Sequence, residues 1–313
     1  MNLHVVIGHG PAGAATARLL AQRGHPVRVV TRSGRSPEPG IEHVALDATD
    51  SARLIEATRG AAAIHSCAAP PYHRWADEWP PLAASLCAAA EATGAVLVML
   101  GNLYGYGPVS GPMTEELPLA ATGPKGRVRA QVWEQARGLH EQGRIKAVEL
   151  RASDFFGPGV TDGGHLAARV VPRLLRGKPV SVLGDPDAPH SWTYLPDVAA
   201  ALVELAGEER AWGRAWHAPT APALSARELV GRLAAEAGTG PVAVRRTPPA
   251  LLGVAALFSP LIRELKEIRY QFDAPFVVDS GAYEAAFAVR ATPVDEQVGA
   301  TVAWWRERLA AAR

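Results

Sequence analysis

Short β-branched segments alternate with longer segments of helical spacing along the first half of the chain, and this alternation restricts the fold more than any other feature. The candidate strands are residues 3–8, 27–31, 44–47, 62–66, 95–100 and 146–150, and the candidate helices between them are residues 12–23, 50–58, 78–93 and 127–142. Strands such as residues 96–100 are continuously apolar, which is typical of parallel strands covered on both faces. We therefore predict an α/β fold built on a doubly wound parallel sheet.

The first strand runs directly into a glycine-rich turn and then into an Ala-rich helix. The turn reads Gly8-His9-Gly10-Pro11-Ala12-Gly13, which is a GxGxxG spacing in a strand-turn-helix context. Glycine lets backbone N–H groups approach a pyrophosphate at the helix N-terminus, and the last glycine lets helix and strand pack closely. A glycine-rich turn without a ligand is the alternative, but the position after the first strand favours dinucleotide binding. The predicted contacts are Gly8, Gly10, Pro11, Ala12 and Gly13.

The second strand ends without the acidic residue that holds the ribose 2′-hydroxyl in NAD-selective sites. The segment after it contains Arg32, Ser33 and Arg35, whose charged and hydroxyl donors suit a 2′-phosphate. We therefore predict NADP (NADPH) rather than NAD as the cofactor, and a solvated loop arginine is the alternative for Arg32. Asp47, after the third strand, is either an acceptor for the adenine amino group or a cap for the next helix.

Proline and glycine become denser after about residue 172, where the regular alternation loosens. We expect a Rossmann dinucleotide-binding domain made of residues 1–172 plus about 190–220. A smaller C-terminal substrate-binding lobe is then expected from about 173–189 plus 221–313. Within that lobe the apolar stretch 250–258 is either buried core or the lining of a substrate pocket, a lid or a subunit contact.

The charge and cysteine content exclude several classes of protein. Among 313 residues, 32 Lys and Arg balance 31 Asp and Glu, so no global field draws the chain to nucleic acid or to a membrane. Cys67 and Cys87 are too few for a disulfide framework, and no His or Cys spacing matches a metal site. No basic leader or long apolar run is present. We expect a cytoplasmic protein without a metal, and a homodimer is a possible assembly.

Several separate segments together resemble the extended short-chain dehydrogenase/reductase family, the NAD-dependent epimerase/dehydratase group. They are the glycine-rich turn; residues 46–50 (LDATD); residues 103–105 (LYG); residues 150–159 (LRASDFFGPG, similar to the family's LRxxNxYGPG); residues 182–199, similar to GDGxxxRDFVHVxDVA; and residues 299–306. The resemblance covers essentially the full length. It implies a nicotinamide cofactor, a small-molecule substrate, and a loop with Ser66 and Ala68 on the nicotinamide side.

The chain departs from this family where the chemistry is carried out. The family uses a Tyr-x-x-x-Lys pair, in which the lysine helps the phenol to exchange a proton while hydride moves at the nicotinamide. No lysine of this chain has a tyrosine four residues before it, and the matching segment places Gly123 and Arg127 at the two positions. The usual upstream Ser or Thr is also missing. Such sequences resemble the atypical branch of the family.

Other residues are candidates to replace the missing pair. Tyr104 and Tyr106 follow the carboxyl end of a strand, where ligands of open α/β sheets bind, although each is also a candidate for loop packing. Asn102 is either a holder of a substrate oxygen or a turn residue. Arg127 cannot give up a proton but can clamp a ribose, a carboxylate or a phosphate. Further candidates with plain structural alternatives are Lys125, which is either buried and titrating or solvated, and His65, His73, His165 and His190.

Two functions of different class follow. The first is an NADP-dependent oxidoreductase or isomerase with a non-standard acid/base, for which Tyr104, Asn102 and Arg127 are the catalytic candidates. The second is a non-catalytic NADP-binding sensor or regulatory protein, or a redox-neutral enzyme with a structural cofactor. Trp192 and Tyr194, where the family's loop meets substrate, favour an apolar or aromatic carbonyl or alcohol over a nucleotide sugar.

Overall fold

The computed structural model describes residues 1–34, 38–161 and 164–311, and its contacts divide the chain into two compact units. The first unit contains Met1–Gly107, Pro118–Ala152 and Val198–Trp216, and the second contains Pro108–Leu117, Ser153–Asp197 and His217–Arg313. The chain passes from the long N-terminal part of the first unit into the second unit after residue 152, whereas the sequence predicted a boundary at about residue 172. The reason is that strand β6 (Lys146–Ala152) is followed almost at once by strand β7 (Asp154–Phe156) of the other unit, with no break in the residue pattern.

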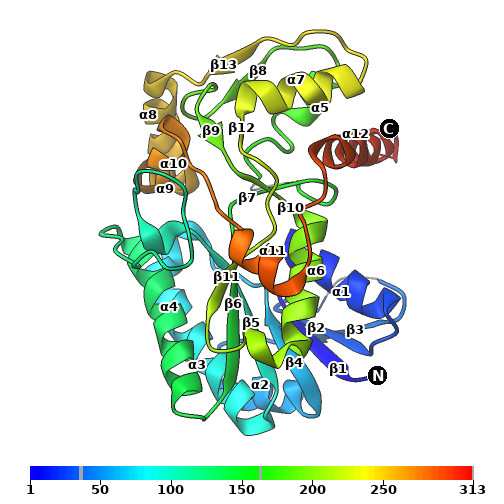
Figure 1. Ribbon diagram of the computed structural model, residues 1–313, viewed down its shortest axis with the longest axis vertical. Helices are drawn as coiled ribbons and strands as arrows, with labels where there is room; N and C mark the ends of the chain where they lie inside the picture. The colour runs from blue at the N-terminus through cyan, green and yellow to red at the C-terminus, as the bar shows by residue number, and fades with distance from the viewer. Residues whose placement is uncertain (35–37, 162–163, 312–313) are drawn as a thin grey trace. The chain divides into compact units, whose positions relative to one another are not determined.

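A seven-stranded sheet in the order β11-β6-β5-β4-β1-β2-β3 forms the centre of the first unit (Figure 1). Its other strands are β1 (Leu3–Ile7), β2 (Val27–Thr31), β3 (Ile41–Ala45), β4 (Ala61–Ser66), β5 (Val96–Asn102) and β11 (Ala215–His217). The neighbouring pairs from β3 to β6 are all parallel. The predicted α/β fold with a doubly wound parallel sheet is therefore confirmed.

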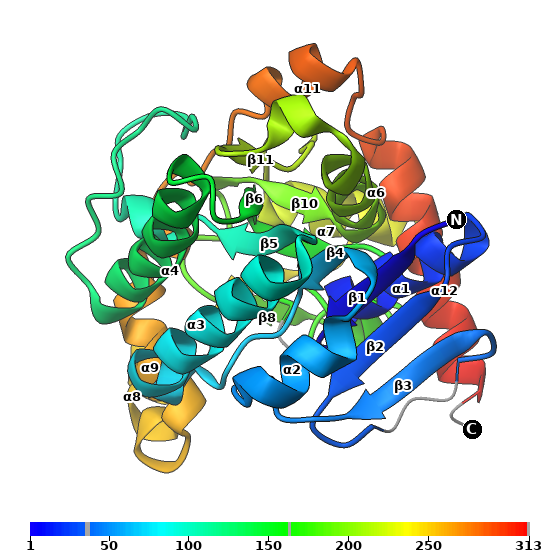
Figure 2. The same ribbon diagram turned by 90° about the horizontal axis from the view of Figure 1, so that it is seen from below.

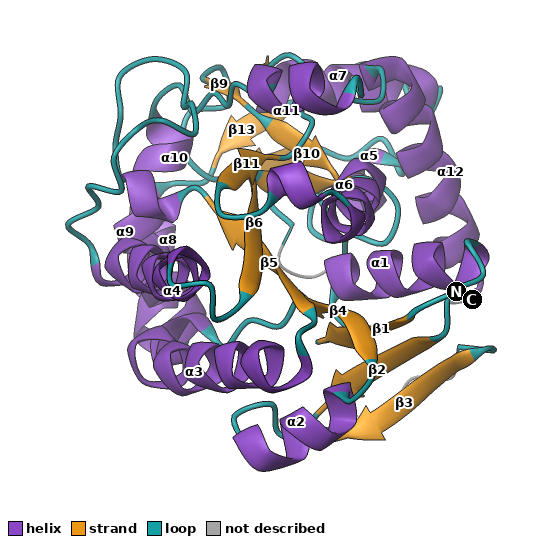
Figure 3. Ribbon diagram, turned by 60° about the horizontal axis from the view of Figure 1, so that its bottom comes forward, coloured by secondary structure: helices purple, strands orange, loops and turns teal. Residues whose placement is uncertain are grey.

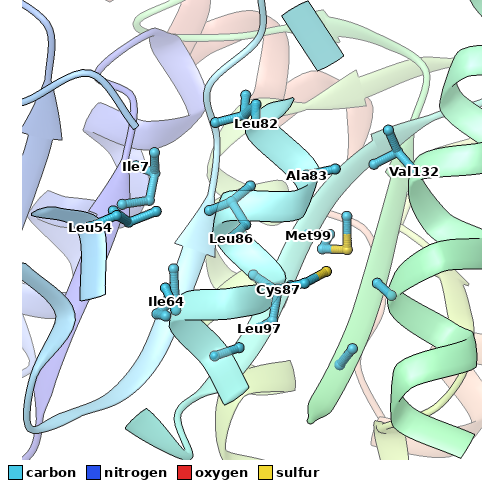
Figure 4. Close-up of a cluster of buried hydrophobic side chains, with 14 of the residues drawn as sticks. Ile7, Leu54, Ile64, Leu82, Ala83, Leu86, Cys87, Leu97, Met99 and Val132 are labelled. Carbon is cyan, nitrogen blue, oxygen red and sulfur yellow. The ribbon is translucent and has the colours of Figure 1, made fainter. Parts of the chain in front are cut away.

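The alternation of side chains along β1 explains how helices cover both faces of this sheet. Val5 and Ile7 belong to one buried cluster with residues of α2 (Ser51–Thr58), α3 (Trp75–Thr93) and α4 (Pro124–Glu141) (Figure 4). The intervening Val6 packs with the opposite helices, α1 (Pro11–Gln22) and α6 (Leu195–Gly207). Figures 2 and 3 show these two helical layers on opposite sides of the strands. Because both faces are buried, alternate residues of a central strand can all be apolar.

Several element boundaries differ from the sequence-based expectations. β3 begins three residues before the predicted 44–47, because Ile41 to Ala45 pair in register with β2 although the segment contains Glu42 and His43. α3 begins at Trp75 rather than at residue 78, and Trp75 and Trp79, one helical turn apart, are both buried. α4 begins at Pro124. Proline is favoured at the first position of a helix, because a backbone N–H there would have no intrahelical acceptor.

The second unit consists of short strand pairs and helices. β7 pairs in parallel with β10 (Trp192–Tyr194), β8 (Val180–Val182) with β13 (Val244–Arg246), and β9 (Pro189–His190) is antiparallel to β12 (Leu224–Ser225). Its helices are α5 (Val171–Leu174), α7 (Ala226–Glu236), α8 (Pro249–Phe258), α9 (Pro260–Ile268), α10 (Tyr270–Asp273), α11 (Gly281–Phe287) and α12 (Val294–Ala311). No helix in the described part of the chain is both long and apolar enough to span a membrane.

Two histidines are buried side by side in the central sheet. His4 Nδ1 lies 3.1 Å from His65 Nε2, and the exposed fractions of the two residues are 7% and 0%. Burial lowers the pKa of His65 to about 3 and that of His4 to about 4, and the mutual repulsion of the imidazoles contributes to the lowering for His65. Both rings are therefore neutral at pH 7, and His65 is part of the sheet core.

These two histidines should make the fold sensitive to acid. Between about pH 4 and 6.5 the unfolded chain binds protons at both imidazoles while the folded chain does not, so stability falls as the pH falls through that window. The melting temperature should drop by roughly 5 °C or more across it. His65→Leu should flatten this dependence, whereas His73→Leu, at an exposed site, should not. An identical slope in wild type and His65→Leu would contradict the assignment.

Candidate functional site

The glycine-rich turn between β1 and α1 is a point of very close backbone approach. Gly8 has a positive φ of 95°, and a Cβ there would come within 2.7 Å of the Ala68 backbone. A Cβ on Gly13 would collide with the carbonyl oxygen of Gly8. The turn, the start of α1 and the loop after β4 therefore meet without room for side chains.

Gly10 differs from Gly8 and Gly13, the other two glycines of the turn, because a side chain at this position would point into open space. It is the N-cap of α1, with φ −70° and no side-chain cap, and a Cβ there would have no neighbour within 4 Å. Pro11, which has no N–H, and Ala12 follow in the first helical turn, where the remaining N–H groups have no intrahelical partner. An anion can approach these donors and the positive end of the helix dipole.

The predicted phosphate-binding residues after β2 lie at the surface. Arg32 and Ser33 are exposed, and Gly34 N–H donates to Thr31 Oγ1 over 3.0 Å. Arg35 lies outside the described residues. The Asp47 carboxylate accepts hydrogen bonds from the backbone and the hydroxyl of Thr49, which lower its pKa, and the charge of Arg32 adds to the lowering.

The helix-cap interpretation of Asp47 is wrong, because a different aspartate caps α2. Asp50 is the N-cap, and its carboxylate accepts the backbone N–H of Arg53. Asp47 closes the preceding turn instead and remains exposed.

The sequence analysis missed Glu38, which stands beside the glycine-rich turn. Arg18 Nε and Nη2 donate to its two carboxylate oxygens over 3.0 and 2.8 Å. His9 Nε2 lies 3.3 Å from the same carboxylate, and burial lowers the pKa of His9. Glu38 lies beyond the end of β2, where the motif places its acidic residue, so no sequence signal marks it. Arg18 compensates its charge.

The loop after β4 forms another wall of the turn. Ser66 is buried, Ala68 is partly buried, and the backbone N–H of Cys67 donates to the Ile7 carbonyl over 2.9 Å. Burial raises the pKa of the Cys67 thiol to about 12, so this residue packs as an apolar side chain and not as a nucleophile.

Two tyrosine hydroxyls meet beyond the carboxyl end of β5. The Tyr104 hydroxyl lies 2.7 Å from the Tyr72 hydroxyl. Each of the two tyrosine rings stacks on the ring of Trp75. Asn102 Oδ1 accepts the backbone N–H of Tyr104 over 3.1 Å, so this side chain shapes the turn that carries the phenol. Tyr104 is partly exposed. Tyr72 was not among the predicted site residues, because its segment lies 32 residues earlier in the chain.

A buried cluster of charges lies beside these tyrosines. Arg151 Nε donates to Glu149 over 2.7 Å, and its Nη1 donates to the hydroxyl of Tyr106 over 2.6 Å. Arg129 Nη2 donates to the Leu100 carbonyl, 3.0 Å away. Burial lowers the pKa of Arg129, while Glu149 and Tyr104 act in the opposite direction. Two guanidinium groups face one carboxylate here, so the cluster carries a net positive charge.

Tyr106 therefore has a structural partner, and Gly101 packs against the same cluster of charges. Tyr106 is 2% exposed and held by Arg151. A Cβ on Gly101 would come within 2.5 Å of Glu149 Oε1. No residue larger than glycine fits at Gly101 while Glu149 keeps this position.

The first turn of α4 carries the remaining basic candidates. Lys125 is 3% exposed, so its interpretation as a solvated lysine is wrong. Arg127 is exposed, and its guanidinium donates to the carbonyl of Thr122. Gly126 between them packs against the Tyr104 carbonyl with no room for a Cβ, which fixes this turn next to the tyrosine segment.

The histidine candidates are dispersed. His65 is in the sheet core, and His73 is exposed after β4. His165 and His190 belong to the second unit, where their rings share Trp192 and Phe272 as stacking partners. Among the residues that the structure describes, no group of three or more His, Cys, Asp or Glu could hold a metal ion.

A substitution at Gly10 tests whether a dinucleotide binds in the open space at the glycine-rich turn. Gly10→Val should fold with the wild-type melting temperature, because its φ is ordinary and nothing lies within 4 Å. The isopropyl group should block the approach to the helix N-terminus and weaken dinucleotide binding at least about tenfold, a loss of roughly 1.4 kcal/mol. Gly138→Val, which also meets open space but lies in α4, is the matched control. Equal binding by both variants in calorimetry would contradict the assignment.

Comparisons with solved structures identify the fold. WbmH of Bordetella bronchiseptica, determined with NAD+, is 20% identical and has a TM-score of 0.74, with 98% of this chain and 99% of that chain covered. dTDP-glucose 4,6-dehydratase of Bacillus anthracis, in complex with NAD, is 16% identical with a TM-score of 0.81, covering 99% and 98%. UDP-glucose 4-epimerase of Thermotoga maritima, with UDP-glucose, is 17% identical with a TM-score of 0.80, covering 99% and 100%.

The sequence comparisons identify the family. No curated protein matches the chain. The family profile described as "NAD dependent epimerase/dehydratase family" matches residues 4–215, which is more than half of the chain. This match includes the glycine-rich turn, the tyrosine segment and the first turn of α4. The predicted resemblance is therefore confirmed, and the chain belongs to the NAD-dependent epimerase/dehydratase family.

Proposed function

We propose that this protein is an NADP-dependent oxidoreductase or isomerase that acts on a small carbonyl or alcohol compound with an apolar or aromatic part. The observation that carries the proposal is the open approach to Gly10 at the N-terminus of α1, bounded by the glycine contacts that hold the turn in place. These contacts suit the pyrophosphate of a dinucleotide. Family membership supports a nicotinamide dinucleotide as the cofactor.

The end of β2 supports NADP over NAD. Two of the solved structures named above, WbmH and dTDP-glucose 4,6-dehydratase, hold NAD, but the segment after β2 here presents Arg32 and Ser33 at the surface and no carboxylate. Glu38 is the first acidic residue after β2 in the sequence, and its bidentate ion pair with Arg18 compensates its charge. An exposed guanidinium next to a hydroxyl suits a 2′-phosphate.

Tyr104 is the proposed proton-exchanging group. The nicotinamide, when bound, supplies or accepts a hydride. Asn102 holds the Tyr104 backbone, and the Tyr72 hydroxyl can share the phenolic proton across 2.7 Å. The buried charge of Arg129 interacts with Tyr104 and stabilises negative charge on its oxygen, a role for which the family uses a lysine. Arg127 cannot exchange a proton, but its exposed guanidinium can clamp a ribose or an anionic group.

The first experiment is a titration of the purified protein with NADPH and NADH, followed by intrinsic fluorescence, and then an assay of NADPH consumption against ketones, enones and aldehydes. Tight NADPH binding with turnover would support the proposed function. Binding without turnover on any compound would favour a sensor or a redox-neutral enzyme with a structural cofactor. If neither nucleotide bound, the cofactor assignment itself would be refuted.

Arg32→Ala should separate the two cofactors. A hydrogen bond to a charged group contributes about 1.5 to 3 kcal/mol, so NADPH binding should weaken about ten- to a hundredfold while NADH binding changes little. Arg23→Ala removes the same charge at the far end of α1 and serves as the control. Equal losses of NADPH and NADH affinity in the Arg32 variant would sink the NADP assignment.

Tyr104→Phe should remove the acid/base contribution, which is about 10²- to 10⁴-fold in turnover, without weakening NADPH binding. Tyr72→Phe should cause a smaller loss and shift the pH profile, because it removes the hydroxyl that shares the proton. Tyr106→Phe is the contrasting variant: it removes the buried acceptor of Arg151 Nη1 and should lower the melting temperature. Full turnover in Tyr104→Phe would refute the assignment.

A further inference from the structure

Helix α8 in the second unit is apolar on every side, yet none of its residues is buried. The chain carries no charged side chain from residue 247 to residue 262. The sequence left buried core open as an interpretation of residues 250–258, and the structure shows that this interpretation is wrong. A helix that is apolar all round is normally enclosed by protein or lipid, so we expect a partner to cover α8.

The side chains of α8 form two stripes at helical spacing. The smaller stripe contains Leu252, Ala255 and Ala256, which are partly buried, and α8 packs against α9 (Figure 2). The larger stripe, called the outer face of α8 below, consists of Leu251, Val254, Leu257 and Phe258. These four side chains are between 57% and 83% exposed. The apolar surface is therefore continuous along the helix.

A sharp turn joins α8 to α9. α8 ends at Phe258 and α9 begins at Pro260, so one residue connects them. The Ser259 hydroxyl accepts the backbone N–H of Ile262 and caps α9, and Pro260 takes the first helical position. Leu257 and Phe258 are therefore the residues of the outer face next to the turn.

Positive charges border the outer face at both of its ends. The exposed basic residues are Arg245 and Arg246 before α8, and Arg263 and Lys266 in α9. The acidic residues between positions 245 and 273 are only partly exposed; they are Glu264, Glu267 and Asp273. The exposed charge around the outer face is therefore positive.

Hydrogen bonds hold part of this charge in place. Arg263 Nη2 donates to the Ala256 carbonyl over 3.4 Å, which keeps the guanidinium beside the last turn of α8. The Asp273 carboxylate is shared, because it accepts from Arg246 Nη2 and from Arg269 Nε, each over 2.6 Å. One carboxylate between two guanidinium groups leaves the surrounding surface positive.

A second copy of this chain fits the outer face poorly. A helix of ten residues is about 15 Å long and about 10 Å wide, so it offers far less than the roughly 800 Å² that each partner contributes to a stable interface. A two-fold pairing would also bring the basic borders of both copies together, whichever way the helices ran. A negatively charged partner avoids this repulsion.

We propose that the outer face of α8 docks on the surface of a lipid bilayer that contains anionic headgroups. Its apolar side chains enter the boundary of the acyl chains, and the basic residues face the headgroups. This binding is peripheral, since α8 is too short to span a bilayer. The balanced charge of the whole chain, from which we expected no attraction to a membrane, does not describe this local surface. The proposal is independent of the dinucleotide site.

The test is sedimentation of the full chain with two kinds of vesicle: phosphatidylcholine alone, and equal parts of phosphatidylcholine and phosphatidylglycerol. Binding to the anionic vesicles should have an apparent Kd on the order of 1 mM lipid or lower. Binding to phosphatidylcholine alone should be at least about tenfold weaker. About 1 M salt should remove this difference, because it screens the headgroup charge.

Paired variants separate the apolar contribution from the charge. Leu257→Gln with Phe258→Gln should weaken binding to the anionic vesicles at least about tenfold, because the apolar groups that enter the bilayer are lost. Both sites are exposed, so the melting temperature should not fall. Val289→Gln, at an exposed apolar residue outside α8, is the control and should bind as wild type.

Arg245→Gln with Lys266→Gln should weaken binding to the anionic vesicles about tenfold and leave binding to phosphatidylcholine unchanged. The control removes two exposed charges elsewhere in the second unit, with Arg176→Gln and Arg290→Gln, and should have a smaller effect.

A fluorescent label distinguishes insertion from adsorption by charge alone. Burial raises the pKa of Cys67 to about 12 and that of Cys87 to about 11, so neither thiol reacts readily at pH 7. A polarity-sensitive dye on Val254→Cys should therefore report on α8, and its emission should shift to shorter wavelength with anionic vesicles. The same dye on Val289→Cys should not shift.

Three results would overturn the proposal. The first is equal binding to the two kinds of vesicle, and the second is wild-type binding by Leu257→Gln with Phe258→Gln. The third is a dimer in vesicle-free solution, measured by analytical ultracentrifugation, that this double variant dissociates. That result would assign the outer face to a second copy of the chain.

Discussion

The contact between the end of β1 and the start of α1 constrains the first unit more than any other interaction. A Cβ on Gly13 would collide with the carbonyl oxygen of Gly8, and a Cβ on Gly8 would collide with the backbone of Ala68 in the loop after β4. Strand, helix and neighbouring loop are thereby fixed to one another at a single position. Open space remains in front of Gly10 at the N-terminus of α1, so the packing that determines the fold also leaves this helix end open to an anion.

The buried charges near β5 and β6 impose a second constraint. Arg129, Glu149 and Arg151 are all at most 4% exposed, and replacing such a cluster by apolar residues is often neutral or stabilising for a fold. Its retention here is consistent with a role at the site. The cluster excludes any side chain at Gly101, holds Tyr106 rigid through Arg151, and places a positive charge near Tyr104. In the proposed reaction, this arginine cluster would supply the positive charge that a single lysine supplies in the family's usual pair.

Local sequence patterns predicted the sheet and the glycine-rich turn because both depend on short-range rules. Strand alternation and the GxGxxG spacing are contained within a few residues. The predicted start of β3 was three residues too late, because pairing with β2 stabilises Glu42 and His43 in a strand despite their low strand propensity. Burial of Lys125 was not predictable, since a lysine in a first helical turn is usually solvated. Pairs that are distant in sequence were missed for the same reason: no local pattern brings Tyr72 to Tyr104, or Glu38 to Arg18.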